Sequence, residues 1–158
     1  MTEKMPQRIM KHFPDLPPVW LVLGIAVAWV LARYIPLVRV VGPVGQGVGV
    51  LLVVAGILLI LWAALWFWRK KTTIEPHDTP TVLIVEGPYR ISRNPIYLGM
   101  LAVLVGVVLW LGAISALPVP FAFAAILTRR FILPEEAALR RSFGAQANAY
   151  LAATRRWV

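Results

Sequence analysis

Polar and titratable side chains gather in two short stretches of an otherwise apolar chain. Residues 72–95 contain His77 and end in the run Arg93-Asn94-Pro95, and residues 129–136 contain two arginines followed by two glutamates. Glycine and proline punctuate the first stretch, as they do in turns and loops, and Pro134 lies in the second. A simple connector needs far fewer polar groups, so these two stretches are the places to look for chemistry.

The adjacent carboxylates of Glu135 and Glu136 directly follow an apolar segment. Two such groups repel each other and prefer water, so their position favours a bound cation such as an ammonium or a sulfonium. A structural alternative stays open. Carboxylates after Pro134 suit the first turn of a helix, and Glu136 could pair with Arg140 one turn later.

The run from Arg93 to Tyr97 also has two interpretations. Asn94 followed by Pro95 is a good helix start, arginines anchor cytoplasmic membrane ends, and tyrosines favour the interface. His77 is a possible proton acceptor or an ordinary loop residue. The chain has no cysteine and only 2 histidines, so we expect no metal site.

The composition predicts an all-α integral membrane protein with a single domain over residues 1–158. Apolar residues make up 59% of the sequence, and the mean hydropathy is +0.75. The net charge of +9 falls between apolar runs, so the expected partner is the lipid bilayer with its anionic headgroups and not nucleic acid.

The apolar runs predict about four spans, at residues 17–37, 47–68, 95–112 and 117–133. We read the first as a retained span, since no convincing signal cleavage site follows it. Residues 95–128 carry no charge and would form a helix of roughly 50 Å, too long for one straight crossing. Gly112, Pro118 and Pro120 supply the break, which predicts a tight hairpin. A further amphipathic helix is expected over 134–158, from the stripe Leu139, Phe143, Ala147 and Tyr150.

The positive charges predict the orientation. All lysines and arginines except Arg33 and Arg39 fall in the N-terminal tail, the loop after the second span or the C-terminal region. The positive-inside rule then places both termini and that loop in the cytoplasm, in what we expect to be a prokaryotic inner membrane. Both polar stretches lie on that side.

The polar stretches also carry a family likeness. The run Glu86-Gly-Pro-Tyr-Arg-Ile-Ser-Arg93-Asn94-Pro95-Ile-Tyr97-Leu-Gly99 resembles the G-P-[YF]-x-x-x-R-[HN]-P-x-Y-x-G signature of the isoprenylcysteine carboxyl methyltransferase and phospholipid methyltransferase superfamily. Glu135-Glu136 with Leu139 and Phe143-Gly144 resembles that family's E-E-x-x-L-x-x-x-F-G element. The likeness covers roughly residues 70–158.

The resemblance implies a small helical membrane enzyme that takes S-adenosylmethionine from the cytosol and methylates an acceptor reached through the bilayer. The cofactor site would lie in residues 72–99 and 129–158. The implied cofactor contacts are Gly87, Tyr89, Arg93, Asn94, Pro95, Tyr97, Gly99, Glu135 and Glu136, and the implied catalytic residues are Arg93, Asn94 and His77.

The acceptor is expected to be a lipid or another membrane-partitioned molecule. Arg129 and Arg130 could hold its phosphate or carboxylate at the membrane surface. Whether the methylated group is a carboxyl or an amine stays open. Two other functions also stay open: a membrane reductase of the sterol type, and a membrane protein that is not an enzyme.

Overall fold

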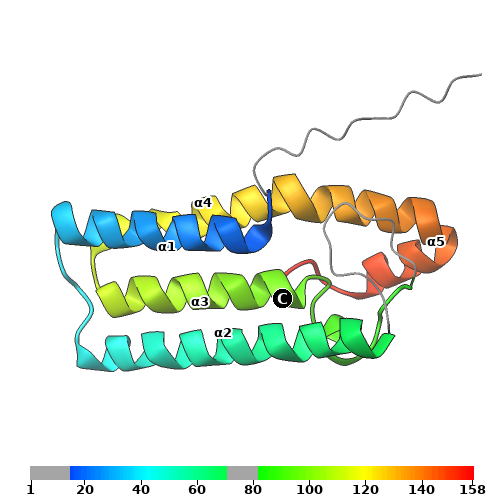
Figure 1. Ribbon diagram of the computed structural model, residues 1–158, viewed down its shortest axis with the longest axis horizontal. Helices are drawn as coiled ribbons and strands as arrows, with labels where there is room; N and C mark the ends of the chain where they lie inside the picture. The colour runs from blue at the N-terminus through cyan, green and yellow to red at the C-terminus, as the bar shows by residue number, and fades with distance from the viewer. Residues whose placement is uncertain (1–14, 71–81) are drawn as a thin grey trace, which may run out of the picture.

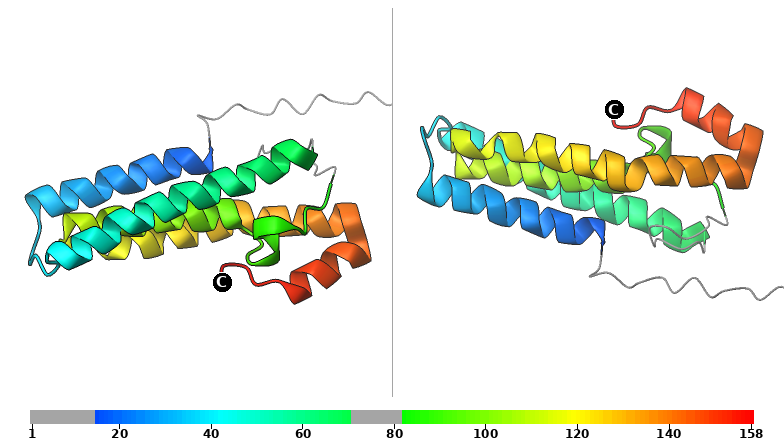
Figure 2. Two further views of the ribbon diagram at one scale, coloured as in Figure 1. Left: turned by 90° about the horizontal axis from the view of Figure 1, so that it is seen from below. Right: turned by 90° about the horizontal axis from the view of Figure 1, so that it is seen from above.

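The structure is a computed structural model, and it describes residues 15–70 and 82–158. In these ranges every regular element is helical, as predicted (Figure 1). The elements in chain order are α1 (Pro17–Tyr34), α2 (Pro43–Lys70), η1 (Gly87–Arg90), α3 (Pro95–Leu111), η2 (Ile114–Ala116), α4 (Pro118–Leu127), η3 (Thr128–Ile132) and α5 (Leu133–Ala153). The helices α1 to α4 lie side by side in a bundle, and α5 extends beyond one end of it (Figures 1 and 2).

Three helical stretches of the described chain are long and apolar enough to cross a membrane. They are α1, α2 and the continuous stretch from η2 to the end of α5, while α3 is apolar but has only 17 residues. Many large apolar side chains on α1 and α2 point outward, which suits lipid contact. The predicted membrane protein is confirmed, with corrected ends: α1 stops at Tyr34, and α2 extends past both predicted limits.

The predicted break at Gly112 and Pro118 is present, and it forms a tight hairpin between α3 and α4. Gly112 ends α3 in the left-handed conformation, with φ of +70°, which glycine adopts without steric cost. Two backbone hydrogen bonds of 3.1 Å tie this hairpin to the connection between α1 and α2. They run from Val40 N to Gly112 O and from Ile114 N to Val38 O. These two connections form one end of the bundle (Figure 1).

Glycines let α2 and α3 pack with their backbones in near contact. A Cβ atom at Gly56 would lie 2.5 Å from Gly99 O, and one at Gly106 would lie 2.5 Å from Gly49 O. Each helix therefore presents two glycines, seven residues apart, to the other. Lipid gives no hydrophobic drive for helix pairing, so close van der Waals packing of this kind holds the two helices together.

Helix α4 does not end before the next helix begins. A π-helical turn, η3, joins α4 to α5, and Ile132 at the start of α5 keeps helical backbone angles. Pro134 lacks an N–H group and crowds the carbonyl four residues earlier, and a wider turn relieves that conflict. Glu135 and Glu136 thus lie within a continuous helical path and not at a free helix start.

The C-terminal region is not one helix to its end. Gly144 has φ of +50° and ψ of −121°, which breaks α5 and turns its second half back toward the bundle (Figure 2). The helix stops at Ala153, and the last five residues are not helical. Ala147 and Leu151 are buried by this return, so the tail caps the bundle end.

Candidate functional site

The two polar stretches of the sequence meet at one end of the bundle. There η1 leads into the start of α3, and the chain after α5 returns to the same place, with the C-terminus beside α3 (Figure 1). The hairpin and the connection between α1 and α2 lie at the opposite end. Packing of α5 and the C-terminal segment against η1 and α3 therefore creates a polar cluster at this end.

Arg93 fixes the C-terminal segment to the start of α3. Its guanidinium donates to Glu136 Oε1 at 3.0 Å, to Thr154 O at 2.5 Å and to Leu151 O, and its backbone N–H donates to Arg155 O. The side chain is 17% exposed. A planar group that serves three acceptors in different directions orders the backbone around it as well as neutralising a charge.

Glu136 is held between two arginines. Arg156 donates from Nε and Nη2 to its two carboxylate oxygens at 2.8 and 2.9 Å, in addition to the bond from Arg93. Hydrogen bonds from Arg156, and then from Arg93, hold the pKa of this carboxyl below its usual range despite burial. Glu136 therefore pairs with Arg93 and Arg156, and not with Arg140 as in the structural alternative, because its carboxylate turns toward the C-terminal segment.

Asn94 occupies the expected position before α3, and Pro95 follows in the first turn, but the asparagine side chain does not cap the helix. Its amide donates to Arg156 O at 2.9 Å instead. The Ser92 hydroxyl accepts from Asn94 N at 3.1 Å and donates to Arg156 O. Both side chains are buried, and their hydrogen bonds tie the C-terminal segment to the start of α3.

Glu135 has a different environment from its neighbour. The Tyr97 hydroxyl donates to Glu135 Oε1 at 2.5 Å, and no arginine pairs with this carboxylate in the described part of the chain. Burial raises the pKa of Glu135 to about 7, and the bond from Tyr97 offsets part of that rise. Near neutral pH the Glu135 carboxyl can therefore gain or lose a proton, and its ionised form can bind a cation.

Aromatic side chains form the wall between η1 and α2. Tyr89 is 7% exposed, packs edge-on against Phe67 at 5.7 Å between ring centroids, and accepts a bond from the Tyr150 hydroxyl at its carbonyl. Gly87 has φ of +59°, and a Cβ there would lie 2.1 Å from the Trp66 indole nitrogen. Only glycine fits this turn.

The described structure brings together most, but not all, of the residues singled out from the sequence. Gly99 faces α2 in the glycine contact and does not reach the polar cluster. Arg129 and Arg130 are exposed on η3, where Arg130 pairs with Asp15 at 2.6 Å and lies over the Trp20 ring. His77 lies outside the described residues.

Sequence reasoning missed four members of the cluster: Ser92, Tyr150, Thr154 and Arg156. Arg156 was missed because its partner Glu136 lies 20 residues earlier and no local spacing links them. Thr154 contributes a backbone carbonyl, which any residue could supply. No sequence signal could have identified that contact.

The arrangement suits recognition of a cationic small molecule at a membrane surface. One carboxylate, Glu136, is saturated by arginines and organises the cluster, while Glu135 keeps an oxygen for which the structure gives no hydrogen bond. Buried tyrosines flank this group. Among the described residues no group of histidines and acids could hold a metal ion.

The sequence matches the family model for phospholipid methyltransferases over residues 44–146. Neither a curated protein nor a solved structure matches the chain. The family match covers α2, α3, α4 and most of the polar cluster, and it accounts for more than half of the chain. The protein is therefore a membrane-embedded member of the phospholipid methyltransferase family.

Proposed function

We propose that this protein transfers a methyl group from S-adenosylmethionine to a lipid or another membrane-partitioned acceptor. The observation that carries the proposal is Glu135, a carboxylate with a neutral-range pKa between buried tyrosines at the end of an apolar bundle. Family membership supports the methyltransferase chemistry. The cofactor when bound supplies the methyl group on a sulfonium, and the protein supplies orientation.

The residues present fit such a cofactor. Glu135 can accept from an ammonium or ribose hydroxyl with the oxygen that Tyr97 does not use. Tyr89 and Tyr97 offer aromatic faces to a sulfonium or a purine. We assign the binding of the cofactor to the cluster as a whole: Gly87, Tyr89, Arg93, Asn94, Pro95, Tyr97, Glu135 and Glu136.

Several of these residues act by shaping the site. Arg93 and Asn94 hold the C-terminal segment through its carbonyls, and Glu136 locks Arg93 and Arg156 in place. Their catalytic contribution would be to fix the acceptor and cofactor in line, and good orientation alone can contribute roughly 7–11 kcal/mol. His77 remains our candidate proton acceptor for an amine substrate.

The acceptor headgroup would rest near η3. Arg129 is exposed there and can meet a phosphate or carboxylate. Arg130 already pairs with Asp15, so an acceptor would have to share or displace that bond. The charge distribution supports an orientation with both termini and this end of the bundle in the cytoplasm, where the cofactor is available.

Calorimetry on the detergent-purified protein tests the proposal. S-adenosylmethionine and its demethylated product should both bind, and Glu135→Gln should weaken binding of the cofactor by about 1.5–3 kcal/mol, the range for a hydrogen bond to a charged group. Arg141→Gln, at an exposed site on α5, is the matched control and should bind normally. Equal affinity in both variants would remove Glu135 from the cofactor site.

A further inference from the structure

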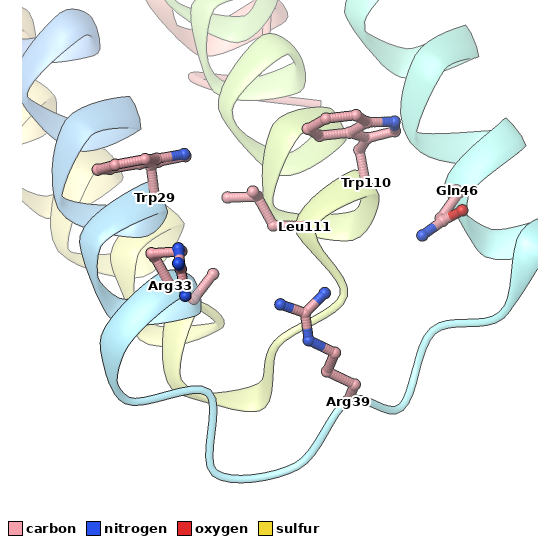
Figure 3. Close-up of a pocket in the computed structure, with 7 residues that line it drawn as sticks. Trp29, Arg33, Arg39, Gln46, Trp110 and Leu111 are labelled. Atoms are coloured by element: carbon pink, nitrogen blue, oxygen red, sulfur yellow. The ribbon is translucent and has the colours of Figure 1, made fainter.

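A second polar feature lies at the end of the bundle opposite to the candidate site. A pocket of about 330 Å³ opens there between α1, the start of α2 and the end of α3 (Figure 3). Arg33 and Arg39 line it together with Trp29, Gln46 and Trp110. The Arg39 side chain extends from the α1–α2 connection into the space between α1 and α3 (Figure 3).

The two arginines have no carboxylate partner in the described residues. Within residues 15–70 and 82–158 the acidic residues are Asp15, Glu86, Glu135 and Glu136. Each is bonded to a side chain at the opposite end of the bundle. Arg33 also lies 5.8 Å from the Tyr34 ring centroid, a contact that leaves its donors available. Two such guanidiniums call for an anion.

The backbone on both sides of Arg39 is fixed. The bonds from Val40 N to Gly112 O and from Ile114 N to Val38 O hold this connection against the α3–α4 hairpin. The α2 helix starts a few residues later, with no acidic residue in its first turn, so its positive end also favours an anion. Arg39 is thus presented by an ordered segment, which lowers the entropy lost on binding.

The surroundings indicate a lipid and not a free ion. Trp29 and Trp110 are 51% and 56% exposed and stand on α1 and α3 at the pocket (Figure 3). Tryptophans at this depth typify the membrane interface, where their rings lie at headgroup level. Beyond them the outer faces of α1 and α2 are apolar and could accommodate acyl chains.

We propose that this pocket binds an anionic phospholipid of the leaflet at that end, with Arg33 and Arg39 holding the phosphate and the two tryptophans flanking the glycerol and upper chains. The site is separate from the methyl-transfer site and does not depend on that activity. It also explains why two arginines are placed against the charge bias of the rest of the chain.

Native mass spectrometry of the detergent-purified full chain tests this proposal. The protein is titrated with phosphatidylglycerol, with phosphatidylcholine of the same chains, and with inorganic phosphate. The test variant is Arg33→Gln/Arg39→Gln, and the control variant is Arg140→Gln/Arg141→Gln, which removes the same charge from exposed positions on α5. Arg39→Lys is a milder third variant that keeps the charge and loses the planar fork.

We expect the wild type and the control to bind one phosphatidylglycerol at least fivefold more tightly than phosphatidylcholine. The test variant should lose this preference while retaining helical circular dichroism, and Arg39→Lys should weaken it. Three results would overturn the proposal: equal affinity for the two lipids in the wild type, an unchanged preference in the test variant, or displacement of the lipid by equimolar phosphate. The first and third results are measured on the wild type alone, so the proposal can be overturned even if the test variant fails to fold.

Discussion

At the scale of single residues, two neighbouring glutamates have different roles. Glu136 is buried and accepts hydrogen bonds from Arg93 and Arg156, so its negative charge is neutralised within the fold. Among the described residues, Glu135 accepts a hydrogen bond from the Tyr97 hydroxyl and pairs with no arginine, and burial raises its pKa. The sequence predicted that the pair matters, but adjacency could not separate their roles, because their partners come from α3 and from the C-terminal segment.

The raised pKa of Glu135 predicts pH-dependent binding of the cofactor. With a pKa of about 7, the carboxyl is mostly protonated at pH 6 and mostly ionised at pH 8. A cationic ligand prefers the ionised form, so its affinity should rise about tenfold between these pH values. Calorimetry at several pH values measures this rise. In Glu135→Gln the part of the pH dependence due to this group should vanish, and an identical profile in both proteins would contradict the assignment.

Replacement of Arg93 by lysine should destabilise the protein even though the charge stays. An ammonium on a flexible stem cannot serve Glu136, Thr154 O and Leu151 O together, and we expect a loss of about 2 kcal/mol in the free energy of unfolding. Denaturant titration in detergent measures it. Arg90→Lys, at an exposed position three residues earlier, is the control and should be close to neutral. If Arg93→Lys and Arg90→Lys have the same free energy of unfolding, Arg93 is only a surface anchor.

At the scale of elements, the hydropathy pattern predicted where the helices lie, and tertiary contacts decided how they end and continue. The break at Gly112 was readable, since glycine and prolines interrupt an overlong apolar run. The return of α5 at Gly144 was not, because a lone glycine inside a helical stripe is usually tolerated. The glycine contact between α2 and α3 was also missed, since it needs both helices in register.

That glycine contact yields a prediction about α2 and α3. In Gly56→Ala the new methyl group would meet Gly99 O at 2.5 Å and a Val103 methyl at 2.9 Å, so the helices must separate. Overpacking of this kind costs about 1–3 kcal/mol, which thermal unfolding in detergent would detect.

The matched control for this helix is Gly47→Ala. No atom lies within 4 Å of a Cβ at Gly47, so the alanine should be neutral or add up to about 1 kcal/mol through helix propensity. A larger loss at position 47 than at position 56 would contradict the packing we describe.

At the scale of the whole molecule, the charged side chains of the described residues lie mainly at one end of the bundle. That end carries the polar cluster, and the other end carries Arg33 and Arg39 between tryptophans, without a carboxylate partner in the part of the chain that the structure describes. The family and the helical membrane architecture could be predicted from the sequence, because the motif Arg93 to Gly99 and the hydropathy are local signals. The joining of residues 92–94 to residues 154–156 could not, because it depends on the return of α5.

The orientation of the bundle can be measured by cysteine labelling, since the natural chain has no cysteine to remove. In intact cells a membrane-impermeant maleimide should label Val44→Cys, which is 83% exposed at the start of α2. Arg141→Cys on α5 should react only after the membrane is permeabilised. The reverse pattern would place the candidate site outside the cytoplasm and separate it from its cofactor.

An assay of methyl transfer to a membrane lipid tests most directly whether this protein is a lipid methyltransferase. The purified protein in detergent is given methyl-labelled S-adenosylmethionine with lipids extracted from its host membrane, and mass spectrometry identifies the labelled product. Short-chain and long-chain forms of that acceptor are then compared in the same assay. We expect a labelled lipid, faster turnover of the long-chain form, and strongly reduced transfer in Glu135→Gln. No labelled lipid despite cofactor binding, or label confined to water-soluble acceptors irrespective of chain length, would contradict this function.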